Sequence, residues 1–400
     1  MTRTLLTGAT VVDGTGAAPA VADVVIEDGR FVGVGVGLDG DESIDLTGKA
    51  LLPGLFDCHV HLTWEDINPM RVQYRPFSME FFEASRNLEL TIAAGVTTVR
   101  DAGGADYGIK QAVDSGYVSG PRVRPSITIL SQTGGHGDDW CPSGGRDGGL
   151  PPHPGRPYNV VDGVDAVRLK VRELVRAGAD CIKVCTSGGV LSPGDSWRHP
   201  QFSPEELDVI VAEATSAGIH VLAHAQAAQG IKNAVRAGIR SIEHGVQLDD
   251  EAIDLMLERG TWLVPTLVAP LGVLEAAAAG TTFPQSVLDK ATEVVEIHRA
   301  SFAKAVEAGV TIAMGTDSGV VPHGRNLREL GLMADGGMKP LDVLTAATSS
   351  AARLLGLDAE LGTIEVGKRA DLVVVDGDPL DVHTIADRVE QVWKDGEREV

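Results

Sequence analysis

A repeated unit of amphipathic segment, glycine and apolar run organises the middle of the chain. In six places an amphipathic segment ends in a glycine and a short, β-branched apolar run follows at once; these glycines are Gly95, Gly178, Gly218, Gly238, Gly260 and Gly309. A glycine just past a helix end adopts the left-handed conformation that closes the helix. A nearly continuous apolar run is typical of a strand buried on both faces. The repeat therefore predicts helix–strand units built on a parallel sheet.

Two further apolar runs, near residues 55–62 and 123–130, bring the number of expected strands to eight. Eight such units predict an α/β fold, a (β/α)8 barrel of the TIM type, over residues 54–361. The chain ends, residues 1–53 and 362–400, instead alternate short apolar runs with turns and hold no long helical pattern. Because the termini of a domain often lie close together, we expect these two segments to form one small β-sandwich domain.

Composition excludes several classes of function. The chain of 400 residues has 34 basic and 56 acidic side chains, a formal charge of −22. Nucleic acids and anionic membranes bind clustered Lys and Arg, so this balance argues against both as partners. The N-terminus lacks the apolar stretch of a signal peptide, and no apolar run is long enough to cross a membrane. Four cysteines are too few for a disulfide scaffold at this length, so we expect a reducing, cytoplasmic location.

Residues able to bind metal stand at the ends of the expected strands. In a TIM-type barrel the active site lies at the carboxyl ends of the strands. These positions hold His59, His61, Lys183, His224, His244 and Asp317. A single histidine is more often a core residue, but this many ligand types at successive strand ends favour a metal site. Imidazole and carboxylate suit zinc, and also manganese, cobalt or iron, so the residues alone do not fix the metal.

Lys183 is unusual in such a set, because an ammonium group is a poor metal ligand and is repelled by the ion. The position makes sense if the amine is deprotonated and has taken up carbon dioxide. The resulting carbamate supplies anionic oxygens for a second metal ion. Cys181 and Cys185 flank Lys183 on the same face of the strand. They would allow a thiolate site, but we expect them to pack as small apolar groups inside the barrel.

Several motifs resemble one known family. They are PGLFDCHVHL, GVTTVRDAGG, SQTGGHG, ADCIKVCTSGG, VLAHA, SIEHG, MGTDSG and the closing LGTIEVGKRADLVVVDG. Together they cover nearly the entire chain and are similar to the metal-dependent amidohydrolase superfamily. The similarity is to the branch of Xaa-Pro and Xaa-Lys/Arg dipeptidases and N-acyl amino acid hydrolases, related to imidazolonepropionase.

The resemblance implies a binuclear site with zinc as the expected metal. His59, His61 and Asp317 would bind the first ion, and His224 and His244 the second. Carboxylated Lys183 and a hydroxide would bridge the two ions. The family also implies a small-molecule amide substrate and a homo-oligomer.

The same resemblance assigns catalytic roles. Two divalent ions lower the pKa of a bridging water, so that hydroxide exists near neutral pH and attacks the amide carbonyl. Asp317 would take the proton and pass it to the leaving amine. His136, in TGGHG, resembles the substrate-contacting histidine of the family, and we expect it to stabilise the oxyanion. A loop histidine exposed to solvent is the alternative.

Substrate specificity is expected in the long segments 137–160 and 186–202, which follow the third and fourth strands. A substrate carboxylate would need an arginine or histidine, for which Arg198 and His323 are candidates beside His136. The dipeptidases resemble HAYT where this chain has HAQA, so Gln226 replaces a substrate-contacting tyrosine. Hydrolysis of a cyclic amide, carbamate or urea is therefore an open alternative. A non-catalytic scaffold would have lost ligand residues, and all six are present.

Overall fold

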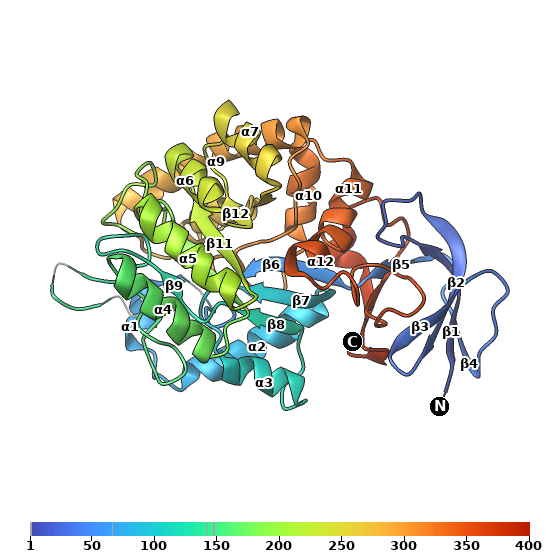
Figure 1. Cartoon of the computed structure of the whole chain (residues 1–400). Helices are drawn as coiled ribbons and strands as arrows, with labels where there is room; N and C mark the ends of the chain where they lie inside the picture. Colours follow the sequence, from blue (N-terminus) through green and yellow to red (C-terminus); the bar gives the residue numbers. More distant parts are fainter. Residues whose placement is uncertain (1, 66, 142, 147–148) are drawn as a thin grey trace.

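The computed structural model describes residues 2–65, 67–141, 143–146 and 149–400. In its central part strands and helices alternate along the chain, and the strands form two parallel sheets (Figure 1). One sheet has the order β6 (Leu55–Val60), β7 (Val96–Asp101), β8 (Arg122–Pro125). The other has the order β13 (Trp262–Val264), β12 (Ser241–His244), β11 (His220–Ala225), β10 (Cys181–Cys185), β9 (Ile129–Leu130). Every pairing within these two sheets is parallel, as the helix–glycine–strand repeat predicts.

Helices lead into most of these strands. They are α2 (Met79–Ala93), α3 (Tyr107–Asp114), α4 (Val164–Arg176), α5 (Pro204–Ser216), α6 (Ala228–Ala237), α7 (Asp250–Arg259) and α9 (Gln285–Ala308). The six glycines expected to close helices all have positive φ, between 65° and 94°. A side chain there would be strained, which explains why glycine recurs at the same point of each unit. The remaining helices are α1 (Pro69–Tyr74), α8 (Val268–Ala278), α10 (Arg328–Asp335), α11 (Pro340–Ala346), α12 (Ser349–Leu355) and the 3-10 turn Ile385–Arg388.

The expected strand near 123–130 is divided in two. Its first half, β8, pairs with β7, and its second half, β9, pairs with β10 in the other sheet. Ile127 lies between them with a φ of 72°, a left-handed conformation that interrupts an extended chain. The chain thus passes from one sheet to the other within one apolar run, which a pattern of apolar residues does not show.

The last expected strand, near residues 311–317, is not a regular strand. Its backbone nevertheless bonds to both sheets: the N–H of Ala313 donates to the carbonyl of Leu263 in β13 at 3.0 Å. The N–H of Cys58 in β6 donates to the carbonyl of Met314 at 2.9 Å, and the N–H of Asp317 donates to the carbonyl of His59 at 2.7 Å. Residues 311–317 therefore lie between β13 and β6, beside the first histidine pair.

Both chain ends contribute to one eight-stranded sheet (Figure 1). Its strands are β1 (Thr4–Val11), β2 (Ala20–Glu27), β3 (Arg30–Gly35), β4 (Glu42–Asp45), β5 (Lys49–Pro53), β14 (Leu372–Asp376), β15 (Val389–Lys394) and β16 (Glu397–Arg398). The two ends join where β14 pairs antiparallel with β5. This sheet has a core of its own, in which Phe31, Leu51 and Leu372 are fully buried. Two separate sheets packed as a sandwich stay a prediction.

None of the described helices is long and apolar enough to span a membrane. Buried apolar side chains of the central part form a continuous core around the strands.

The start of α5 allows a test of local stability. Ser203 caps the helix: its Oγ accepts from the N–H of Glu206, whose carboxylate accepts from the N–H of Ser203, and Pro204 occupies the first turn. Such a reciprocal cap satisfies two N–H groups that lack a helical partner. Ser203→Ala should lower the free energy of unfolding by about 1 kcal/mol in urea denaturation. Ser203→Asp, which keeps a capping oxygen, should not; equal losses in both variants would contradict the capping role.

Candidate active site

The six expected metal ligands lie together at the carboxyl ends of the strands. His59 is in β6, Lys183 in β10, His224 in β11 and His244 in β12. His61 follows β6 directly, and Asp317 lies in the segment between β13 and β6. All six side chains are buried, and all six line one cavity of about 670 Å³. That volume is in the usual range for sites that enclose a small molecule.

Three of these side chains are close enough to share one metal ion. Single ligand atoms of His59, His244 and Asp317 lie within 4.8 Å of one another. Oδ1 of Asp317 is 3.1 Å from Nε2 of His61 and 3.5 Å from Nε2 of His59. Nζ of Lys183 is 3.4 Å from Nε2 of His59.

The other nitrogen of each ring is occupied by a protein group that orients it. Nδ1 of His59 lies 2.7 Å from the Glu243 carboxylate, and Nδ1 of His61 lies 2.7 Å from the Gly103 carbonyl. Nδ1 of His244 contacts the Thr266 hydroxyl at 2.7 Å. A carboxylate and a carbonyl only accept hydrogen bonds, so Nδ1 of His59 and of His61 carries the hydrogen and Nε2 keeps the lone pair that a metal ion would need. His224 differs, because its Nε2 contacts the Gly188 carbonyl at 3.1 Å, which leaves Nδ1 for a ligand.

Burial and repulsion by neighbouring positive charge keep three of the histidines neutral. Burial, together with the nearby Lys183, holds the pKa values of His59, His224 and His244 well below the usual range. Burial also lowers the pKa of the Lys183 amine, and the neutral amine is the form that reacts with carbon dioxide. Burial by itself would raise the pKa of Asp317, but the neighbouring His59, His61 and Lys183 lower it to about 2. Asp317 is therefore an anion at neutral pH, as a ligand carboxylate must be.

Backbone strain accompanies two of the expected ligands. His244 has a φ of 71° and Asp317 a φ of 63°, both left-handed. Non-glycine residues in this conformation cost about 1–3 kcal/mol and cluster at functional sites. In this conformation the backbone turns at the end of each extended segment, and both side chains line the cavity.

A buried ion pair supports the first histidine. The Glu243 carboxylate accepts from Nη2 of Arg100 at 2.8 Å and from the Ser241 hydroxyl at 2.6 Å, besides contacting His59. Arg100 also donates to the Cys58 carbonyl at 2.7 Å. Both charges are almost completely buried, so each depends on the other. Sequence reasoning missed this pair, although one arginine and one glutamate inside two apolar strands are a signal for a buried ion pair.

Glu243 should therefore influence metal binding without touching the metal. Glu243→Gln keeps an oxygen for His59 but removes the charge opposite Arg100. We expect the affinity for zinc to fall about 10-fold, in the range known for groups that orient a ligand. Competition with a chromogenic chelator measures this, with the exposed Glu258→Gln in α7 as a control. An unchanged zinc affinity would mean that Glu243 does not orient His59.

The expected substrate contacts fall into two groups. His136 and Gln226 line the cavity. The His136 ring stacks on His224 with centroids 4.1 Å apart, and Oε1 of Gln226 is buried without a hydrogen-bond partner among the described residues. Arg198 and His323 are not among the described residues that line it. Arg198 is an exposed partner of Glu293, and both ring nitrogens of His323 are occupied, by the Thr91 hydroxyl and the His61 carbonyl.

The two cysteines of β10 and the segment 137–160 are the other candidates. Cys181 and Cys185 are buried, and burial raises the pKa of each thiol to about 12, so neither forms a thiolate near neutral pH. Of segment 137–160, residues 142 and 147–148 lie outside the described residues. Its described part places Asp138, Trp140 and Asn159 on the cavity wall.

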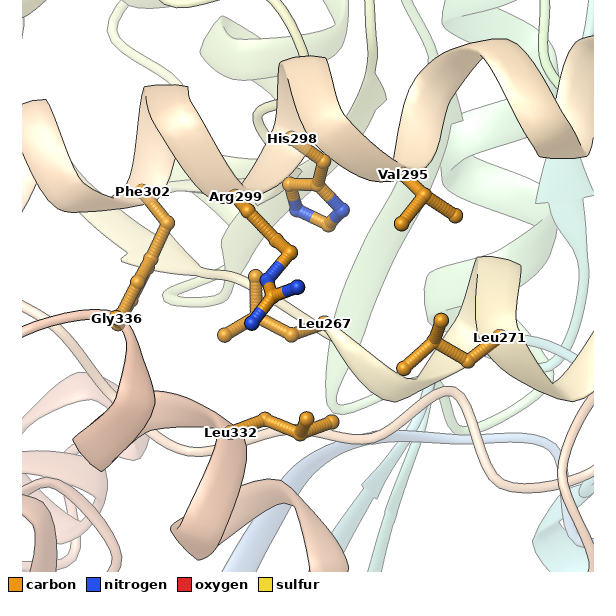
Figure 2. A pocket seen from close by; sticks show the side chains of 8 residues that line it. All are labelled: Leu267, Leu271, Val295, His298, Arg299, Phe302, Leu332 and Gly336. Carbon is orange, nitrogen blue, oxygen red and sulfur yellow. The ribbon is translucent and has the colours of Figure 1, made fainter.

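The cavity has two unlike walls. One is an aliphatic wall. Its valines include Val246, which follows β12, Val273 in α8, and Val287 and Val294 in α9. The other carries the polar groups of the loops after β9 and β10. His298 on α9 lines this cavity and also a second pocket of only about 20 Å³ (Figure 2). That pocket has space for about one water molecule, and Nε2 of His298 contacts the His244 carbonyl at 2.8 Å.

Comparison with known proteins places the chain in a family. The model of the amidohydrolase family matches residues 50–399. The chain belongs to the amidohydrolase family. It is an enzyme of the hydrolase class, and the family and its solved structures imply a TIM-type barrel.

Individual relatives agree with this assignment. The chain is 36% identical to ochratoxinase of Aspergillus niger over 86% of this chain and 75% of that protein. It is 26% identical to imidazolonepropionase of a Geobacillus strain over 88% of this chain and 83% of that protein. Among solved structures, a Xaa-Pro dipeptidase with bound methionine in the active site matches with a TM-score of 0.91 and 36% identity, covering 99% of both chains.

Proposed function

We propose that this amidohydrolase is a binuclear metal-dependent enzyme that cleaves the amide bond of a dipeptide or an N-acyl amino acid. One observation carries the proposal: six side chains of ligand type converge, buried, on one cavity of about 670 Å³. Two similar proteins support the substrate class: a Xaa-Pro dipeptidase, and a prolidase complexed with N-methylphosphonate-L-proline.

The donor set fits divalent metal ions. Neutral imidazoles and one ionised carboxylate are the ligands that zinc prefers, and the oriented Nδ1 atoms of three rings favour binding through Nε2. His59, His61 and Asp317 would hold one ion and His224 and His244 the other, and Lys183, as its carbamate, would supply anionic oxygens to both. When bound, such ions activate a water molecule and polarise the substrate carbonyl.

The residues of the chain then have distinct tasks. The Asp317 carboxylate accepts a proton from the attacking water and passes it to the leaving nitrogen, for which its ionised state at neutral pH and its place beside His61 in the cavity suit it. His136 on the polar wall and Gln226, directly after β11, contact the substrate. The aliphatic wall takes an apolar side chain or acyl group and excludes water from the reaction.

The fold supports this arrangement in one further way. We propose that residues 54–361 close into an eight-stranded barrel through segment 311–317, whose backbone bonds to β13 and to β6. Residues 1–53 and 362–400 would then form a separate domain around their shared sheet.

Substrate trials test the proposal directly. The protein, reconstituted with zinc and bicarbonate, is assayed for amine release from a library of dipeptides and N-acyl amino acids, with chelator-treated protein as the blank. Turnover concentrated on one class of leaving amino acid, and absent from the blank, would support it. No turnover across the library would reject dipeptides and N-acyl amino acids as the substrate class. The search would then turn to cyclic amides, carbamates and ureas.

A further inference from the structure

The loop that follows β10 surrounds His136 on one side. Oγ of Ser192 lies 2.7 Å from Nδ1 of His136, and the same hydroxyl donates a short hydrogen bond to Oδ1 of Asp195. The other carboxylate oxygen, Oδ2 of Asp195, accepts from the N–H of Gly189 at 3.2 Å and from Nε2 of Gln201 at 3.3 Å. Asp195, Ser192 and His136 thus form a chain of hydrogen bonds that ends at the imidazole.

The direction of this chain follows from the chemistry of its members. An ionised carboxylate only accepts hydrogen bonds, and a serine hydroxyl has a single hydrogen to donate. That hydrogen is used by Asp195, so Oγ of Ser192 acts as the acceptor toward His136. Nδ1 of His136 must therefore carry the hydrogen. In the neutral ring the lone pair is then on Nε2, and no described residue donates a hydrogen bond to Nε2.

Two features hold this arrangement in place. Nζ of Lys290 on α9 donates to the carbonyls of Gly189 and Ser192, at 2.6 Å and 2.5 Å, and so fastens the loop to the helix behind it. A Cβ at Gly189 would clash with Cε1 of His136, so only glycine lets the loop approach the ring this closely. The loop therefore packs directly against the imidazole of His136.

We propose that Ser192, itself oriented by Asp195, is a positioning residue that fixes His136 as the Nδ1–H tautomer and presents Nε2 to the cavity as a hydrogen-bond acceptor. This changes the task expected for His136 from the sequence. A neutral ring in this tautomer has no hydrogen to offer an oxyanion at Nε2, but it accepts one from the N–H of the substrate amide or of the leaving amine. The catalytic part of this inference rests on the proposed function, whereas the tautomer does not.

The tautomer is measured first, on the zinc-reconstituted protein and without turnover. Two-bond ¹H–¹⁵N spectra of protein labelled at histidine distinguish Nδ1–H from Nε2–H, and His136→Gln assigns the signals. We expect the Nδ1–H pattern in the wild type, its loss in Ser192→Ala, and its return in Ser192→Thr, which keeps the hydroxyl. An Nε2–H pattern in the wild type, or a pattern unaffected by Ser192→Ala, would overturn the proposal.

Kinetics give the second readout. With a substrate found in the library, Ser192→Ala should lower kcat about 10- to 100-fold and change KM less, the range known for groups that orient an active residue. The exposed Ser216→Ala at the end of α5 is the matched control. A loss confined to KM would contradict an effect on the reacting step. If no amide is turned over, the proposed function fails, while the tautomer measurement still decides the role of Ser192.

Discussion

We expect Asp317→Asn to reduce kcat about 10²- to 10⁴-fold, the range for removal of a group that transfers protons in the transition state. The carboxylate of Asp317 is an anion at neutral pH, because His59 and His61 hold its pKa at about 2 despite its burial. Asparagine has nearly the same shape but neither binds metal as an anion nor accepts a proton. Steady-state kinetics on the substrate identified in the library measure the effect.

The matched control is Asp254→Asn, an exposed aspartate on α7, which should leave kcat at the wild-type value. Thermal unfolding of Asp317→Asn shows whether the variant folds. A folded Asp317→Asn protein with a kcat near that of the wild type would remove Asp317 from the mechanism.

Lys183→Ala should reduce turnover at least about 100-fold. The reason is that the proposed carbamate is the only side chain we assign to both metal ions. The Lewis-acid contribution of bound metal is worth several kcal/mol, at about 1.4 kcal/mol for each factor of ten in rate. We expect the variant to retain about one metal ion less per chain than the wild type. Metal analysis after gel filtration, together with kinetics, measures both effects.

An exposed lysine on α9 provides the control, since Lys304→Ala should change neither metal content nor turnover. Added short-chain carboxylic acids should partly restore the activity of Lys183→Ala, because they supply a carboxylate in the space that the side chain leaves. A Lys183→Ala protein with full metal content and full turnover would contradict the bridging role.

Local signals in the sequence predicted much of the fold because they repeat. Gly95 and Gly309 stand at equivalent points of two units, and both have the left-handed φ that closes a helix. The convergence of His59, His224 and His244 followed from the geometry of parallel strands, whose carboxyl ends meet on one side. These predictions needed only spacing and residue type.

Other features depend on contacts between distant segments, which spacing does not encode. Ile127 interrupts an apolar run that looks like one strand, and only the pairing of β8 and β9 with different sheets reveals the break. Glu243 is next to His244 in sequence, yet its role comes from Arg100 and His59, more than 140 residues away. His323 has a suitable residue type for binding a carboxylate, but Thr91 and the His61 carbonyl occupy both its nitrogens.

Metal dependence is the central claim, and a titration of the metal-free protein tests it most directly. The protein is stripped with a chelator, supplied with zinc in the presence of bicarbonate, and analysed for bound metal and amide hydrolysis at each step. We predict no turnover in the metal-free protein and full turnover at about two zinc ions per chain, as in other two-metal sites. Full turnover by the metal-free protein would contradict the account.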